Sequence, residues 1–183
     1  GPCGYAAAAF SVVAPGARVV AIQPQATLDP RVTEWDDRFT DMRRLDFTSR
    51  YGYAPDMLEA AERAFVLYDP AEPLDAMHAA LFTRTNVTKL RMPYMGAALQ
   101  TDLMEMERLS ALLAAAGDGT LDAGSFARLY RARRDYRPYL RNLLDRLEAD
   151  DRDLLVEALC RNVTSRMRGR RFSARLNGLE RRR

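Results

Sequence analysis

Gly1-Pro2-Cys3-Gly4-Tyr5-Ala6-Ala7-Ala8-Ala9-Phe10 opens the chain, and its small residues pass directly into an apolar helix. Pro15-Gly16 follows, and then Arg18-Val19-Val20-Ala21-Ile22, which has the β-branched composition of a strand. Glycine and alanine let a chain turn sharply into a helix that packs closely on a sheet. The stretch therefore predicts that a helix of small residues lies against a buried strand.

Two further β-branched or aromatic runs, at residues 64–68 and 87–92, are bounded by Pro or Gly and predict strands. Helices are predicted between the strands, over residues 56–63, with Asp56 as the cap, and over residues 74–82. Strands that alternate with helices imply βαβ units and a parallel sheet. The predicted fold class is α/β, with a small three-layer parallel sheet of about three strands.

A sheet of three strands has two exposed edges, and such an arrangement usually requires further strands or a partner chain. We therefore expect either that a missing segment precedes the first strand or that the chain forms a homo-oligomer.

From Leu99 onward the hydrophobic period changes to 3.6, which predicts short helices joined as antiparallel hairpins. The predicted domains are an α/β domain over residues 3–110, a helical appendage over residues 111–165, and a basic tail over residues 166–183. We expect this tail to be disordered.

Charge is distributed unevenly along the chain, whose net charge is +3. Residues 161–183 hold nine Arg and one Glu, a net charge of +8, so residues 1–160 carry −5. An arginine-rich end of this density can bind phosphate backbones or other anionic surfaces. It is equally typical of a solvated terminus, since Phe172 is its only aromatic residue.

The composition argues against several classes of protein and site. A hydrophobic content of 48% suffices for a core, and no apolar run reaches membrane-spanning length, so we expect a cytoplasmic protein with no membrane partner. Cys3 and Cys160 lie at opposite ends and are expected to be reduced thiols, although the sequence leaves a disulfide open. Neither a metal-ligand spacing nor a glycine-rich phosphate motif occurs, so no metal and no cofactor is expected.

Three motifs carry a resemblance to a known family: Cys3-Gly4-Tyr5-Ala6, the run 23–29 (Q-P-Q-A-T-L-D) and the run 68–75 (Y-D-P-A-E-P-L-D). They are similar to S-M-G-G-Y-A, S-P-Q-A-T-L-D and Y-D-P-x-E-P-L-D of α/β-hydrolase-like bacterial serine hydrolases. Residues 3 to about 110 resemble the C-terminal half of such an enzyme. The resemblance implies hydrolysis of an ester or similar acyl bond by a nucleophile, an acid and a His, in that order along the chain.

Two of the three catalytic groups are missing from the positions that the resemblance assigns to them. Gly1 and Pro2 stand where the nucleophilic Ser and its follower would be, and Ala97 stands where the family's P-x-x-G-H turn has its general base. Asp69 matches the acid, with Asp75 as the alternative, although both also suit a turn or a helix cap. Without an imidazole the rate is expected to fall by orders of magnitude, so the resemblance implies an incomplete or inactive serine hydrolase.

Cys3 and His78 are the remaining candidates for catalysis. A thiol at a strand-to-helix turn, near a helix N-terminus, can act as a nucleophile, which would give Cys3 a catalytic role. His78 is the only histidine and is expected inside the helix that follows the acid loop. An isolated histidine at such a position is either a base or a packed or surface residue.

A second class of function is a non-enzymatic interaction module. In this interpretation the helical region and the Arg-rich tail bind a protein or a polyanion, and the hydrolase-like half is a scaffold. Steep salt dependence of binding to a polyanion would distinguish the tail as a functional element.

Overall fold

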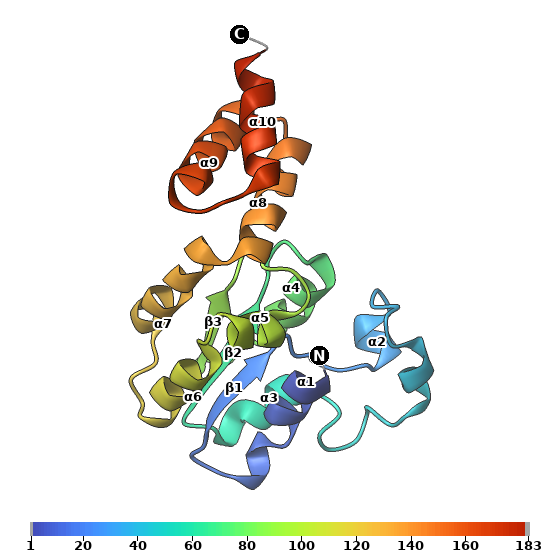
Figure 1. The fold of residues 1–183 in the computed structure, drawn as a ribbon. Helices are drawn as coiled ribbons and strands as arrows, with labels where there is room; N and C mark the ends of the chain where they lie inside the picture. The colour runs from blue at the N-terminus through green and yellow to red at the C-terminus, as the bar shows by residue number, and fades with distance from the viewer. Residues whose placement is uncertain (1, 182–183) are drawn as a thin grey trace. The chain divides into compact units, whose positions relative to one another are not determined.

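The computed structural model describes residues 2–181. The chain divides into two compact units between Tyr136 and Arg137, and Figure 1 shows the elements of both. We call residues up to 136 the α/β unit and the residues from 137 onward the helical unit.

The α/β unit contains a parallel sheet of β1 (Arg18–Ile22), β2 (Arg63–Tyr68) and β3 (Val87–Arg91), with β2 in the centre. The register pairs Val20 with Phe65 and Leu67 with Leu90. These strands coincide with the three β-branched runs. The predictions of an α/β fold and of a three-stranded parallel sheet are therefore confirmed.

Short helices connect and cover these strands. The α-helices are α1 (Pro2–Ala9), α2 (Pro30–Thr33), α3 (Ala54–Met57), α4 (Pro73–Ala80), α5 (Leu99–Glu105), α6 (Leu109–Gly117) and α7 (Ala123–Tyr130). Single turns of 3₁₀-helix form η1 (Ser11–Val13), η2 (Thr40–Arg44), η3 (Leu58–Ala60) and η4 (Arg131–Asp135). The helix expected over residues 56–63 is wrong in its bounds, because it begins with Pro55 in its first turn and ends before β2.

The two faces of the sheet pack against different helices. Ala64 and Val66 belong to a core cluster with residues of α1, η3 and α4. Phe65 and Leu67 alternate with them, so they point to the opposite face, and both are almost fully buried. On that face α5 and α6 lie in front of the sheet (Figure 1). This burial on both faces explains why β2 reads as a continuous apolar run.

Gly4 allows α1 to approach β1 closely. A Cβ built at Gly4 would collide with the carbonyl oxygen of Ile22 and lie 3.1 Å from the Cα of Pro24. The small-residue run at the start of the chain therefore has the packing role expected from the sequence, with the start of α1 beside the end of β1.

The helical unit consists of α8 (Arg137–Ala149), α9 (Asp153–Arg166) and α10 (Arg170–Glu180). Its core includes Leu144 from α8, Cys160 from α9, and Phe172 and Leu179 from α10. The expected disordered tail is therefore instead a helix as far as Glu180, because Phe172 and Leu179 recur on one face and are buried.

The division between the units also differs from the predicted boundaries at residues 110 and 165. Helix α6 contacts β1 and α7 contacts β3, so both belong to the α/β unit, and α10 contacts α9. Within residues 2–181, no helix combines the length and the apolar character that crossing a membrane requires.

Candidate functional site

Gln23, Asp69 and Met92 directly follow the carboxyl ends of the three parallel strands. These ends meet on one side of the sheet, which we call the carboxyl edge, and it is there that ligands bind in open α/β sheets. Gln23 has a φ of +48°, so the chain turns sharply as β1 ends. Its N–H group still donates to the carbonyl oxygen of Leu67 at 2.8 Å, which continues the pairing with β2. This turn directs the Gln23 side chain toward the loops of the edge.

Asp69 follows β2 and is fully buried. Its Oδ1 accepts the backbone N–H groups of Ala71 at 2.8 Å and Tyr94 at 3.0 Å, and its Oδ2 accepts the N–H group of Gly96 at 2.7 Å. Tyr94 and Gly96 both have positive φ values, a conformation that glycine adopts freely but that is unfavourable for Tyr94, so the carboxylate stabilises a turn that the backbone of Tyr94 disfavours. The structure thus brings Asp69 next to Ala97, which is exposed.

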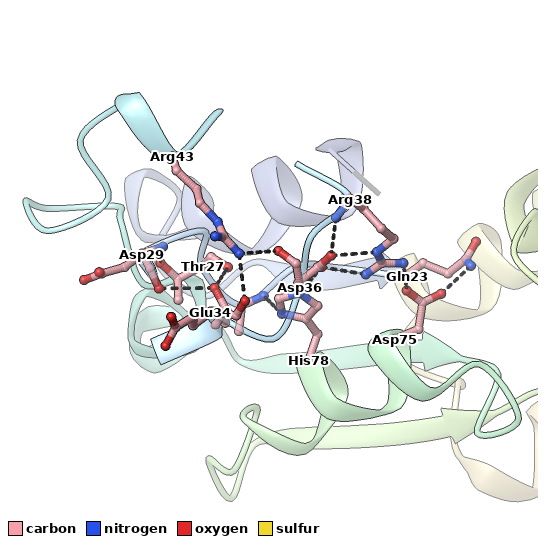
Figure 2. A network of polar contacts seen from close by, with 11 residues as sticks. Gln23, Thr27, Asp29, Glu34, Asp36, Arg38, Arg43, Asp75 and His78 are labelled. Atoms are coloured by element: carbon pink, nitrogen blue, oxygen red, sulfur yellow. Dashed lines mark hydrogen bonds and ion pairs between the residues drawn. The ribbon is translucent and has the colours of Figure 1, made fainter. Parts of the chain in front are cut away.

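Arg38 joins two buried aspartates at this edge (Figure 2). Its Nε and Nη2 donate to the Asp36 carboxylate at 3.0 and 2.8 Å, and its Nη1 donates to Asp75 Oδ1 at 2.7 Å. Asp75 Oδ2 accepts from Gln23 Nε2 at 2.7 Å, while Gln23 Oε1 accepts the N–H group of Leu99 at 3.0 Å. The network therefore links the end of β1, the start of α4 and the start of α5.

His78 completes the network from α4, where its ring lies 4.7 Å from that of Trp35 between centroids. Its Nδ1 accepts the N–H group of Ala26 at 3.1 Å. A backbone N–H can only donate, so Nδ1 carries no proton and Nε2 must carry one. Nε2 donates this proton to Asp36 Oδ2 at 2.8 Å, and both nitrogens of the neutral ring are thereby engaged.

Burial and charge explain the ionisation of these groups. Burial lowers the pKa of His78, and its bond to Asp36 only partly opposes this effect. Burial alone would raise the pKa of Asp36, but hydrogen bonds from Arg38 and His78 outweigh burial and hold that pKa well below its usual range. Asp36 is therefore ionised beside a guanidinium and a neutral imidazole.

The catalytic candidates of the sequence analysis are thus separated into two groups. Asp69 lies with the loop of Ala97, whereas Asp75 is bound to Arg38 and reaches His78 only through Arg38 and Asp36. His78 makes its hydrogen bonds to Ala26 and Asp36 and lies in the structure as a packed residue. This end of the sheet contains Asp69, which the resemblance assigns to the acid, and an imidazole that has no free nitrogen.

Cys3 is exposed in the first turn of α1, and both Cys3 and Cys160 are free thiols. The only imidazole of the chain is committed to Ala26 and Asp36, so it does not activate this thiol. Gly1, which the resemblance places at the nucleophile, lies outside the described residues.

Asp36 and Arg38 are the central residues that the sequence analysis missed. The signal for them is the spacing Asp-x-Arg, which is a weak one because it occurs five times in the chain. Asp29 and Asp36 each accept the backbone N–H group two residues later and also bind the side chain of that arginine, Arg31 or Arg38. This spacing closes a local turn, while the further link from Arg38 to Asp75 depends on the fold.

A second group of carboxylates surrounds Tyr136. The Tyr136 hydroxyl lies 2.8 Å from Asp102 Oδ1 and 2.6 Å from Glu105 Oε2, while Asp102 Oδ2 is buried without a hydrogen-bond partner among the described residues. A phenol has one proton, so both short contacts are satisfied together only when one carboxyl is protonated. Burial raises the pKa of Asp102, so the protonated form is less disfavoured at Asp102 than at an exposed aspartate.

The helical unit contains a groove of about 500 Å³, which we call the arginine groove. Its rim is formed by Arg137, Arg141, Arg168 and Arg170, all exposed. The apolar side chains of Leu140, Val163, Met167 and Phe172 line the rest. The groove lies where α8 begins, α9 ends and α10 begins.

Comparisons of this chain with protein-family models, with curated proteins and with solved structures found no match. Over the described part of the chain, no group of three or more His, Cys, Asp or Glu side chains is arranged to hold a metal ion.

Proposed function

We propose that the α/β unit is an inactive relative of α/β-hydrolases, a scaffold with the architecture of an acyl-ester hydrolase that does not hydrolyse esters. The resemblance of the three motifs suggests the parent reaction. The geometry of the carboxyl edge suggests that the reaction has been lost.

The observation that carries this proposal is the environment of Asp69. In an active triad, the acid binds the histidine and holds it in one tautomer. Here the Asp69 carboxylate accepts three backbone N–H groups, two of them from the loop that contains Ala97, so the acid stabilises the loop itself. An alanine cannot remove a proton from a nucleophile, and His78 has no free nitrogen to replace it.

Hydrolysis of a short-chain p-nitrophenyl ester tests the proposal. We expect the wild-type rate to equal that of the Cys3→Ala and Asp69→Asn variants, because neither residue serves a catalytic step. Circular dichroism of each variant would verify that it is folded. A wild-type rate clearly above both variants would overturn the proposal, and a loss in Cys3→Ala alone would identify a thiol nucleophile.

Binding through the helical unit is the second candidate function, and it is compatible with a scaffold role for the α/β unit. The arginine groove favours it, because guanidinium groups around an apolar floor are typical of binding surfaces. The cytoplasmic location expected from the sequence remains part of this proposal.

A further inference from the structure

The rim of the arginine groove carries positive charge that the fold leaves uncompensated. Arg137, Arg141, Arg168 and Arg170 are exposed, and their side chains make no ion pair or hydrogen bond within residues 2–181. An unpaired guanidinium presents several N–H donors to an incoming anion. The four rim arginines are therefore available to an external partner of negative charge.

The acidic residues of the helical unit pair with other arginines and leave the rim uncompensated. Residues 137–183 hold thirteen arginines and seven acidic residues, a net charge of +6. Ion pairs join Asp145 and Glu148 to Arg171, Glu148 and Asp153 to Arg175, Asp150 to Arg146, and Glu157 and Glu180 to Arg161. Charge complementarity therefore favours a polyanion as the partner of the groove.

The lining of the groove argues against two kinds of anionic partner. Leu140, Val163 and Phe172 are at most 5% exposed, so the groove offers little apolar surface to anchor a side chain of a protein partner. Single-stranded nucleic acids stack their bases on exposed aromatic rings, and the ring of Phe172 is buried. The phosphates of a duplex require neither an apolar anchor nor an exposed ring.

Helices α9 and α10 are connected in the manner of a helix-turn-helix. Three residues, 167–169, join the end of α9 to the start of α10. Gly169 keeps this turn tight, since a Cβ there would lie 2.9 Å from Cδ2 of Phe172. A short turn that contains glycine is typical of DNA-binding helix-turn-helix motifs, whose second helix enters the major groove.

The exposed face of α10 carries side chains that can read base edges. Arg170, Ser173, Ala174 and Asn177 are all exposed, and their spacing of three and four residues places them on one face of the helix. The same residues line a second hollow of about 750 Å³, which shares Arg168 and Arg170 with the arginine groove. In the major groove, arginine pairs with guanine, asparagine pairs with adenine, and the methyl group of alanine contacts that of thymine.

We infer that the helical unit binds duplex DNA, with α10 in the major groove and Arg137, Arg141 and Arg168 on the flanking phosphates. Arg170 belongs to both surfaces and lies where they meet. Duplex RNA does not fit this arrangement, because its deep and narrow major groove does not admit side chains. The inference rests on the binding role proposed for the helical unit and is independent of the loss of ester hydrolysis in the α/β unit.

Fluorescence anisotropy of the full chain with a labelled random-sequence duplex of about 20 base pairs tests the phosphate contacts. Three contacts predict that affinity falls about fortyfold between 50 and 200 mM salt, because each contributes about 0.9 to the salt slope. Arg141→Gln/Arg168→Gln should weaken binding at least about tenfold at the lower salt and reduce the slope by about 1.8. Arg128→Gln/Arg152→Gln is the matched control, since it removes the same charge from exposed positions outside the groove and should bind as wild type.

Selection from a pool of random duplexes tests the reading of base edges by α10. We expect the wild-type chain to enrich a preferred sequence. Asn177→Ala should bind that sequence about tenfold more weakly, while its salt slope stays as in wild type, because asparagine contacts a base and carries no charge. Both side chains are exposed on α10, so Ser173→Ala is a matched substitution of smaller expected effect. A wild-type chain that enriches no sequence would contradict the placement of α10 in the major groove.

The binding role and the DNA inference fail in different ways. Binding to polyglutamate through Arg141 and Arg168, without binding to duplex DNA, would overturn DNA as the partner and leave the binding role in place. Absence of binding to any of duplex DNA, single-stranded DNA and polyglutamate would overturn both. Equal losses in Arg141→Gln/Arg168→Gln and in the control would show that net charge, and not the arginine groove, is responsible. Circular dichroism of every variant would verify that it is folded.

Discussion

Arg38 in the α/β unit and Arg141 in the helical unit are the same residue type in opposite situations. Arg38 is held by Asp36 and Asp75, both of which are buried, whereas the side chain of Arg141 has no partner in the described chain. A guanidinium that is already paired stabilises the fold, and one that is unpaired at a groove is available for binding. The motifs that resemble a catalytic site thus lie where the polar side chains are already paired. The unpaired guanidinium groups lie instead at the arginine groove of the helical unit, where no such motif occurs.

Of the substitutions considered, removal of Asp36 from its network with Arg38 and His78 should have the largest effect on stability. Asp36→Ala leaves Nε and Nη2 of Arg38 and the Nε2–H of His78 without their acceptor, although Arg38 keeps its bond to Asp75, so we expect the free energy of unfolding to fall by about 3 kcal/mol. Urea denaturation measures this. Asp37→Ala is the matched control, because Asp37 is the exposed neighbour; equal effects of the two substitutions would show that the network contributes little.

Close packing in the α/β unit can be compared directly with open space in the helical unit. Gly4→Ala should destabilise by about 1–3 kcal/mol, because its new Cβ meets the backbone of Ile22 and Pro24. Gly178→Ala in α10 should stabilise by about 0.5–1 kcal/mol, since a Cβ there meets no atom within 4 Å and alanine favours the helix. Thermal unfolding of both variants shows whether each is less or more stable than wild type. A Gly4→Ala variant as stable as wild type would disprove the close approach of α1 to β1.

Asp102 differs from the paired aspartates of the α/β unit, because its buried Oδ2 has no hydrogen-bond partner among the described residues. Its contribution to the free energy of unfolding should therefore depend on pH weakly, and with the opposite sign to that of a paired carboxylate. Burial raises its pKa in the folded state, so its contribution to stability is present at low pH and lost as pH rises through that value. Asp102→Asn should therefore be more stable than wild type near pH 7, by about 0.5–1 kcal/mol. The gain should shrink toward about pH 4, the ordinary pKa of an aspartate.

Urea denaturation at several pH values measures this difference, with Glu105→Gln as the control on the exposed carboxyl that contacts the same hydroxyl of Tyr136. A variant that is less stable than wild type at neutral pH would mean that the Asp102 carboxylate is ionised and favourable.

The strands could be predicted because each is a short β-branched or aromatic run with a clear boundary. The Asp36 network could not be predicted from the sequence, because Asp36 and His78 are 42 residues apart and come together only when α4 packs on the sheet. The helix α10 was missed for a similar reason. Its many arginines indicate solvent, and only the packing of Phe172 and Leu179 against α9 makes it a helix.

The protonation state of His78 tests the central claim most directly, because the chain has one histidine and its imidazole nitrogens give an unambiguous ¹⁵N signal. We predict a neutral ring with the proton on Nε2, unchanged as pH falls through about 6.5, the ordinary pKa of histidine. Because burial lowers the pKa of His78, the accompanying stability should be greatest above that pH and decline as pH falls further. A ring that titrates near its ordinary pKa, or that exchanges between tautomers, would contradict the account and return His78 to the list of available bases.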